Sequence, residues 1–154
     1  MKVSDFLKKD FILSELISQS KEDVLKELSG FLESKDAIRN KEGLLKALLE
    51  REALGSTGIG ENVAIPHAKS DQIKNITALF ARSKEGINFD SLDQKPVHYV
   101  CLLIAPSNST GLHLKALARI AKLLKINDLR TKILTARSTD EIHSIILEED
   151  GKLR

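Results

Sequence analysis

The stretch "VHYVCLLIA", Val97–Ala105, decides the fold class of this chain. It is rich in branched and aromatic residues over the length of one β-strand, and it has few polar positions. A strand that is apolar on both faces lies near the centre of a sheet whose two faces are both covered. Cys101 lies inside this run, where a thiol is usually buried and unreactive. We therefore expect residues 97–105 to form a central strand.

The segments around this strand show both strand and helix patterns. The run "ITALFARS" at 76–83 predicts a second strand, and "NVAI" at 62–65 predicts a shorter one. Apolar residues recur at helical spacing behind Ser20 and Asn40, two residues that favour the N-cap position of a helix. Further helical patterns cover residues 107–125, 129–136 and 138–149. The sequence thus predicts a single α/β domain over residues 1–154, with a mixed sheet flanked by helices on both sides.

Composition excludes several classes of protein. Of the 154 residues, 42% are hydrophobic and 30% are charged, which suits one domain that buries its own core. Twenty-four basic and twenty-two acidic residues leave a formal charge of +2, spread along the chain, so nothing indicates nucleic-acid binding. The N-terminal "MKVSDFLKKDFILSEL" has charges where a signal peptide needs an apolar core, and residues 97–105 are too few to span a bilayer. We expect a cytoplasmic protein without membrane insertion, disulfides or a cofactor.

One histidine stands in a setting that suggests a function. The stretch "STGIGENVAIPHAK", Ser56–Lys69, ends on a Pro-His pair that follows the short strand predicted at 62–65. Pro66 fixes one backbone dihedral directly before His67, and Ala68 leaves space after it. This arrangement predicts an imidazole that is exposed in a fixed direction at the end of a strand.

Two other chemistries fit this stretch less well. The three glycines of residues 55–60 follow a helix pattern in the order GxxGxG, whereas a dinucleotide-binding loop needs GxGxxG after a strand. A P-loop needs Lys and then Ser or Thr directly after its last glycine, and this chain has Glu61 and Asn62 there. No histidine or cysteine stands three or four residues from His67, so zinc could be held only with distant residues. The sequence predicts no metal site.

The residues around His67 resemble a known signature. They look like the active-site signature of the type-2 IIA components of the bacterial phosphoenolpyruvate-dependent phosphotransferase system, the mannitol, fructose and nitrogen-regulatory branch. The matching residues are Glu52, Ile59, Gly60, Val63, Ala64, Ile65, Pro66, His67 and Ala68. The resemblance spans the chain, because "SDFLKKDFIL", "LLEREALGSTGIG" and "GLHLKALARIAKLL" also look like this family.

The resemblance implies that His67 accepts a phosphoryl group through Nε2. The donor would be the phosphohistidine of a small carrier protein called HPr, or of its nitrogen-branch relative. A neutral imidazole nitrogen is a good nucleophile near pH 7, and the phosphoramidate that it forms can be passed on. The chain would then be a phosphotransferase component that carries a phosphoryl group without being a multiple-turnover enzyme on its own. Such transfer needs donors near the phosphoryl oxygens to stabilise their negative charge.

Two side chains are the main candidates for these donors. His113 lies at the start of a predicted helix, and the resemblance places a second histidine of the family beside the active one. Without the resemblance, the pattern fits a polar residue in an exposed first turn nearly as well. Arg51 closes the helix before the glycines, where the helix dipole favours a cation in any case. The resemblance adds that its planar guanidinium can bind phosphoryl oxygens in pairs.

The remaining polar candidates have simpler explanations. Ser56 and Thr57 offer hydroxyl donors on the glycine loop, and ordinary turn chemistry explains them as well. His98 lies in the alternating part of the central strand, and His143 lies beside the apolar face of the last helix. We expect these two histidines to be structural or solvent-facing.

The sequence leaves two functions open. In the sugar-transport branch, the phosphoryl group passes from a IIA histidine to a IIB cysteine, and Cys101 is too apolar in its setting to be that cysteine. A IIB acceptor would therefore be a separate polypeptide. In the other interpretation the phosphorylation state is itself the signal and controls regulatory target proteins. The run "REALGSTGIG" and the single-domain length look more like the nitrogen-regulatory members, which favours this second interpretation.

Overall fold

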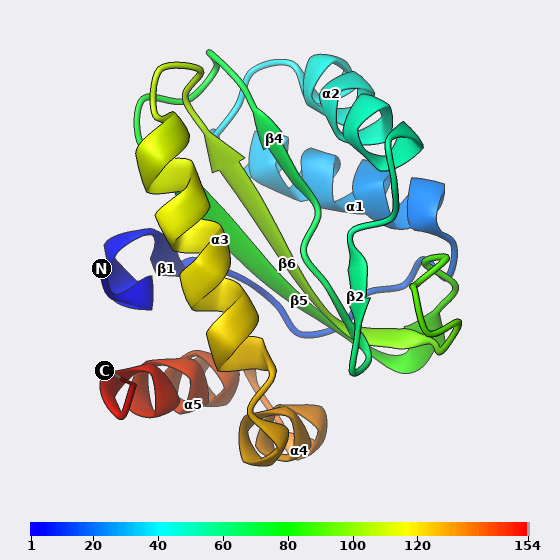
Figure 1. Ribbon diagram of the computed structural model, residues 1–154, viewed down its shortest axis with the longest axis vertical. Helices are drawn as coiled ribbons and strands as arrows, with labels where there is room; N and C mark the ends of the chain where they lie inside the picture. The colour runs from blue at the N-terminus through cyan, green and yellow to red at the C-terminus, as the bar shows by residue number, and fades with distance from the viewer. Residues whose placement is uncertain (154) are drawn as a thin grey trace.

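The fold is built on a mixed six-stranded β-sheet (Figure 1). The computed structural model describes residues 1–153. The strands are β1 (Leu7–Leu13), β2 (Gly58–Gly60), β3 (Val63–Ala64), β4 (His67–Lys69), β5 (Thr77–Ile87) and β6 (Val97–Ala105). The central strand β6 has the bounds that the sequence predicts, and the α/β fold class is confirmed.

β6 pairs with other strands along both of its edges. β5 runs antiparallel to it on one side, and β1 pairs with β5 in parallel. On the other side β3 and β4 follow one another along β6, so that Val63 lies opposite Tyr99 and His67 lies opposite Leu103. β2 then pairs antiparallel with β3 at the sheet edge. His67 is therefore held by the sheet near the C-terminal end of β6.

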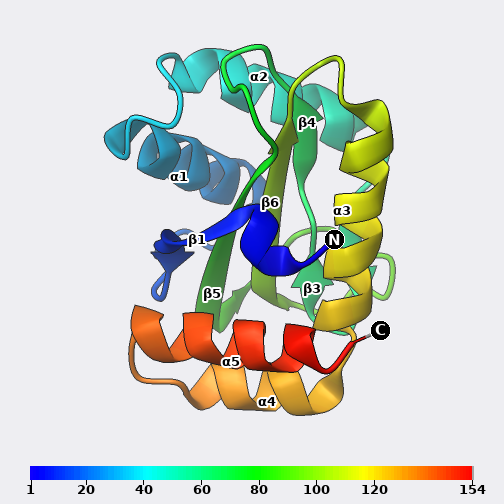
Figure 2. The same ribbon diagram turned by 90° about the vertical axis from the view of Figure 1, so that its left-hand side faces the viewer.

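Five α-helices cover the sheet. They are α1 (Lys21–Ser34), α2 (Lys41–Ala53), α3 (Thr110–Leu124), α4 (Asn127–Thr135) and α5 (Thr139–Gly151). Figure 2 shows α1 and α3 on opposite faces of the sheet, with α4 and α5 stacked together at the end of the molecule away from α2. The predicted N-caps are confirmed, because the Ser20 side chain accepts a hydrogen bond from the Asp23 amide and the Asn40 side chain accepts one from the Gly43 amide.

The core lies on both faces of the sheet, as the apolar β6 predicts. Every residue of β6 except His98 is buried. Cys101 is 4% exposed, and burial raises the pKa of its thiol to about 12, so the prediction of a buried thiol is confirmed. The helices formed by residues 1–153 include none that is long and apolar enough to cross a membrane.

The sequence patterns do not predict β1, β2 or β4. β1 follows a short 3₁₀ turn near the N-terminus (Val3–Asp5). The strand carries three consecutive exposed charged residues at positions 8–10. Its register with β5 shifts between Leu7 and Ile12, so the alternation that identifies a strand is interrupted. β2 and β4 have only three residues each, too few to show any periodicity.

Candidate functional site

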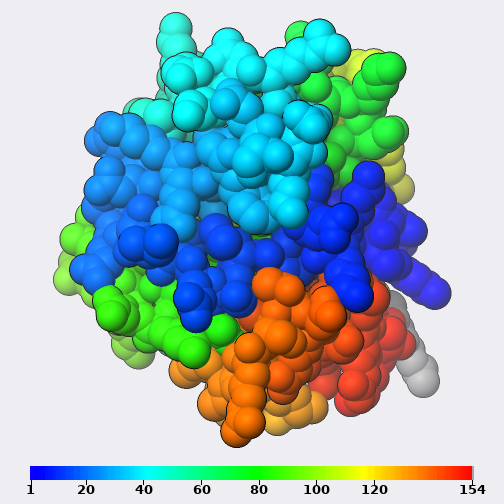
Figure 3. All heavy atoms as spheres, turned by 180° about the vertical axis from the view of Figure 1, so that it is seen from behind, coloured from blue at the N-terminus to red at the C-terminus, as the bar shows by residue number. Residues whose placement is uncertain are grey.

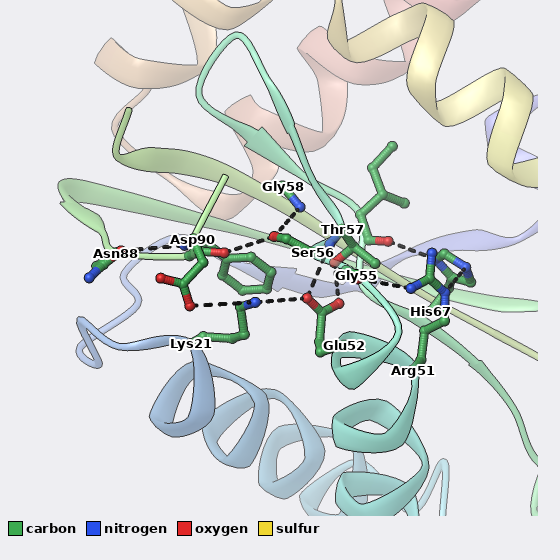
Figure 4. Close-up of polar contacts among 12 residues, drawn as sticks. Lys21, Arg51, Glu52, Gly55, Ser56, Thr57, Gly58, His67, Asn88 and Asp90 are labelled. Atoms are coloured by element: carbon green, nitrogen blue, oxygen red, sulfur yellow. Dashed lines mark hydrogen bonds and ion pairs between the residues drawn. The ribbon is translucent and has the colours of Figure 1, made fainter. Parts of the chain in front are cut away.

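His67 is fixed by a hydrogen bond from its own ring. It is the first residue of β4 and is half-buried, and its Nδ1 lies 2.9 Å from the carbonyl oxygen of Ile65 (Figure 4). A carbonyl oxygen can only accept, so Nδ1 carries the proton in the neutral ring. The other nitrogen, Nε2, then has a free lone pair. The backbone next to Pro66 thus selects both the orientation and the tautomer of this imidazole.

Arg51 approaches the free nitrogen of His67. Its Nε donates to His67 Nε2 at 3.3 Å, and its Nη1 donates to the carbonyl oxygen of Gly55 at 2.9 Å. Arg51 lies in the last turn of α2, so the helix and the following loop both position the guanidinium. The donor geometry agrees with Nε2 being the unprotonated nitrogen. Figure 4 shows the guanidinium beside the His67 ring.

The ring of His113 packs against the ring of His67. The two ring centroids are 5.4 Å apart, and the rings meet edge to face at 88°. His113 is in the first turns of α3, where the sequence alone allowed an exposed residue, but it is only 6% exposed. Neither of its buried ring nitrogens has a hydrogen-bond partner within residues 1–153. A buried polar group without a partner is costly, so this side chain is suited to a group that the structure does not contain.

Both histidines favour the neutral form. Burial lowers the pKa of His67 below its ordinary value of 6.5, the hydrogen bond to Ile65 raises it, the charge of Arg51 lowers it, and that of Glu52 raises it. Burial also lowers the pKa of His113, and the positive charges of His67 and Lys69 lower it further. Near pH 7 the site therefore holds a neutral imidazole with a free lone pair, next to a cation.

Lys69 is a second cation at this site that the sequence analysis missed. Its Nζ donates to the hydroxyl of Thr110, the first residue of α3, at 2.7 Å. Lys69 follows His67 by two positions on the same strand, so both side chains lie on one face of β4. That spacing was the signal available in the sequence. Lys69 adds positive charge at the N-terminal end of α3, where the helix dipole is also positive.

Glu52 organises the loop between α2 and β2. Its buried carboxylate accepts from the amide of Thr57 at 3.1 Å and from the Thr57 hydroxyl, and it pairs with Lys21 at 3.2 Å. Lys21 also reaches Asp90 at 3.7 Å and lies over the ring of Phe89. Figure 4 shows these contacts extending from the start of α1 to the glycine loop. The residue next to Arg51 therefore ties the loop to α1.

The hydroxyls of Ser56 and Thr57 are both engaged within the loop. Ser56 Oγ donates to the carbonyl oxygen of Phe89 at 2.9 Å and accepts from the Gly58 amide at 3.1 Å, while the Thr57 hydroxyl donates to Glu52. In this structure neither hydroxyl proton is available to a group on His67. They serve the turn chemistry that the sequence analysis gave as the alternative. Gly58 is required here, because a Cβ would come within 2.3 Å of Ser91 Oγ.

The other histidines lie apart from these contacts. His98 Nδ1 lies 2.7 Å from the carbonyl oxygen of Ser83, and this hydrogen bond joins β5 to β6. His143 is a half-buried residue of α5. Within residues 1–153, no three or more histidine, cysteine or acidic side chains are grouped so that they could hold a metal ion.

Comparison with known proteins places this site in a family. The model of the phosphoenolpyruvate-dependent sugar phosphotransferase system, EIIA 2, matches residues 5–149. A nitrogen regulatory protein of Bradyrhizobium diazoefficiens is 39% identical over 146 residues, which are 95% of each chain. The fructose-specific EIIABC component of Bacillus subtilis is 37% identical over 97% of this chain, which spans 24% of that protein.

A solved structure agrees with these sequence relations. The crystal structure of the nitrogen regulatory protein IIA-Ntr of Neisseria meningitidis superimposes with a TM-score of 0.85 at 32% identity. The superposition covers 94% of this chain and 98% of that chain. The match over residues 5–149 and these relatives show that the chain belongs to the EIIA type 2 family of the phosphoenolpyruvate-dependent sugar phosphotransferase system.

Proposed function

We propose that His67 accepts a phosphoryl group on Nε2 from the phosphohistidine of an HPr-type carrier protein. The observation that carries this proposal is the hydrogen bond from Nδ1 to the Ile65 carbonyl, which leaves the Nε2 lone pair facing Arg51. Because burial keeps the pKa of His67 low, the ring is a neutral nucleophile near pH 7. Family membership supports the assignment of a phosphoryl-transfer role.

The transfer exchanges one phosphorus–nitrogen bond for another. The lone pair of His67 Nε2 attacks phosphorus, and the bond from phosphorus to the donor imidazole breaks, with its electron pair returning to the donor nitrogen. The proton stays on Nδ1 throughout and remains hydrogen-bonded to the Ile65 carbonyl oxygen. Because Arg51 Nε already donates to Nε2, its guanidinium is placed to donate to the phosphoryl oxygens as they arrive.

His113 and Lys69 complete the proposed phosphoryl environment. The buried His113 nitrogens lack partners in the structure, and a phosphoryl group on His67 would bring an acceptor to one of them. Lys69 and the first amides of α3 add positive potential on the same side. In this proposal Arg51 and His113 stabilise the transferring group, and neither accepts it.

We infer further that the phosphorylation state controls regulatory partners of the protein in the cytoplasm. The relative named nitrogen regulatory protein matches this chain over 95% of both lengths, which supports this function over sugar uptake. Cys101 cannot receive the group, because its thiol is buried and its pKa is raised to about 12. Phosphorylation adds about two negative charges to a chain of formal charge +2, a large change for a binding surface.

The test is phosphorylation with phosphoenolpyruvate, enzyme I and an HPr-type donor. The wild-type protein should take up label that is labile in acid and stable in base, and His67→Gln should take up none. Label that persists on His67→Gln would overturn the proposed acceptor. The purified phosphoprotein is then mixed with fructose- and mannitol-type IIB domains. If the label passed to a IIB domain as fast as the HPr-type donor phosphorylates the protein, the protein would instead be assigned to sugar uptake.

A further inference from the structure

A cavity of about 730 Å³ lies apart from the contacts made by His67. Three segments supply most of its lining: the N-terminal segment with β1, the connection from α1 to α2, and the connection from β4 to β5. Leu112 of α3 completes the lining. Figure 3 shows these segments adjoining on the face opposite that of Figure 1, in dark blue, light blue to cyan, and green. The volume is within the range of small-molecule sites, roughly 300–1,000 Å³.

The charges around the cavity are unbalanced. Its lining contains four cations and two carboxylates, and the cations are Lys8, Lys35, Arg39 and Lys74. Within residues 1–153, none of these four cations forms an ion pair with a carboxylate. Lys35 lies 5.4 Å from the ring of Phe31. The cations outnumber the carboxylates around this concave surface, and such an excess of positive charge attracts anions.

The lining of the cavity also contains apolar side chains. They include the buried side chains of Phe6, Phe11, Ile38 and Ile73. A bare inorganic anion would contact only the cations, whereas an organic anion would contact both the cations and the apolar side chains. We propose that this cavity binds a nucleotide-sized organic compound that carries two or more phosphate charges. Its phosphates lie against the cations and its ring system lies against the apolar side chains.

Hydrogen bonds hold two of the walls together without a ligand. Gln72, from the β4–β5 connection, accepts from the amides of Arg39 and Asn40 and donates to the Asn40 carbonyl. Asn40 in turn caps α2, the helix that carries Arg51 in its last turn. The cavity is therefore largely preformed, which lowers the entropic cost of binding.

Titration with ADP, followed by amide chemical shifts of the ¹⁵N-labelled protein, tests the proposal. We expect saturable shifts concentrated in residues 35–39 and 72–77, with a dissociation constant of roughly 1 mM or tighter. Inorganic diphosphate should bind more weakly, because it has no apolar part. Equal affinity for both probes, or no saturable shift at about 5 mM ADP, would overturn the proposal.

Two sets of variants locate the binding. The double variant Arg39→Gln/Lys74→Gln should weaken ADP binding roughly tenfold or more, since charge-assisted contacts are lost. The matched variant Lys46→Gln/Lys84→Gln removes the same charge outside the cavity and should leave ADP binding unchanged. His67→Ala should also keep its affinity for ADP, because His67 does not line the cavity and ADP binding involves no phosphoryl transfer. Equal losses in both double variants would show attraction to net charge alone, and loss in His67→Ala would place ADP at the other site.

Discussion

At the scale of the residue, the two nitrogens of His67 have different tasks. Nδ1 holds the ring to the Ile65 carbonyl, and Nε2 is left for chemistry. Because burial lowers the pKa of His67, we expect an NMR titration of the ring protons to give a midpoint below 6.5. Loading of the protein by its donor should then stay constant from pH 8 down to this midpoint and fall below it. A midpoint above 6.5 would contradict the described environment.

The same shift links pH to stability. The unfolded chain has the ordinary histidine pKa near 6.5, so below that pH it binds a proton that folded His67 does not yet bind. The contribution of His67 to stability is therefore complete above pH 6.5 and is lost as the pH falls towards its folded pKa. His113, whose pKa is also lowered by burial, contributes with the same sign.

Arg51 and His113 should affect how fast His67 is phosphorylated, and not which residue accepts the phosphoryl group. Losing one charge-assisted donor costs about 1.5–3 kcal/mol, so Arg51→Ala and His113→Ala should slow loading roughly ten- to a hundredfold. Arg51→Lys should recover little, because an ammonium cannot reach both Gly55 and His67 with a planar fork. Quench-flow measurement of labelled protein gives these rates. Wild-type rates in both alanine variants would show that neither side chain stabilises the group.

At the scale of the element, the loop after α2 depends on one buried carboxylate. Glu52→Gln removes the charge that pairs with Lys21 and weakens the contacts with Thr57. We expect a loss of about 1–3 kcal/mol, which lowers the melting temperature by about 3–10 °C in a domain of this size. Glu50→Gln is the matched control, because Glu50 is an exposed residue of the same helix. Melting curves followed by circular dichroism would refute this account if both variants melted alike.

Strongly patterned elements could be predicted from the sequence, whereas β1, β2 and β4, which show no regular pattern, could not. β6 was predicted because nine residues with few polar positions need cover on both faces, and α1 and α2 because Ser20 and Asn40 precede regular apolar spacing. β4 has three residues, and only pairing with β6 makes it a strand. Tertiary contacts, which no local pattern contains, decide such elements.

The same distinction applies to the candidate site. The Pro66-His67 pair and Arg51 stand out within a few residues of sequence, and the resemblance to a family supplied His113. Lys69 was missed because its role depends on Thr110, forty-one positions further on. The partners of Ser56 and Thr57, which are Phe89 and Glu52, could not be predicted from the local sequence. Side-chain direction on a loop is set by contacts across the fold.

At the scale of the whole molecule, the sheet brings three elements to one place. α2 supplies Arg51, β4 supplies His67 and Lys69, and α3 supplies His113, although these residues span more than sixty positions of sequence. β6 makes this possible, because β4 pairs with its C-terminal half and α3 begins shortly after it ends. These elements therefore meet around one nitrogen atom, Nε2 of His67.

Long-range ¹H–¹⁵N NMR of the phosphorylated protein tests that claim most directly. The account predicts that the phosphoryl group lies on Nε2 of His67, with Nδ1 still protonated and hydrogen-bonded to Ile65. The ring nitrogens of His113 should shift at the same time, because a phosphoryl oxygen becomes their neighbour. A phosphoryl group found on Nδ1 of His67, or on either nitrogen of His113, would contradict the account.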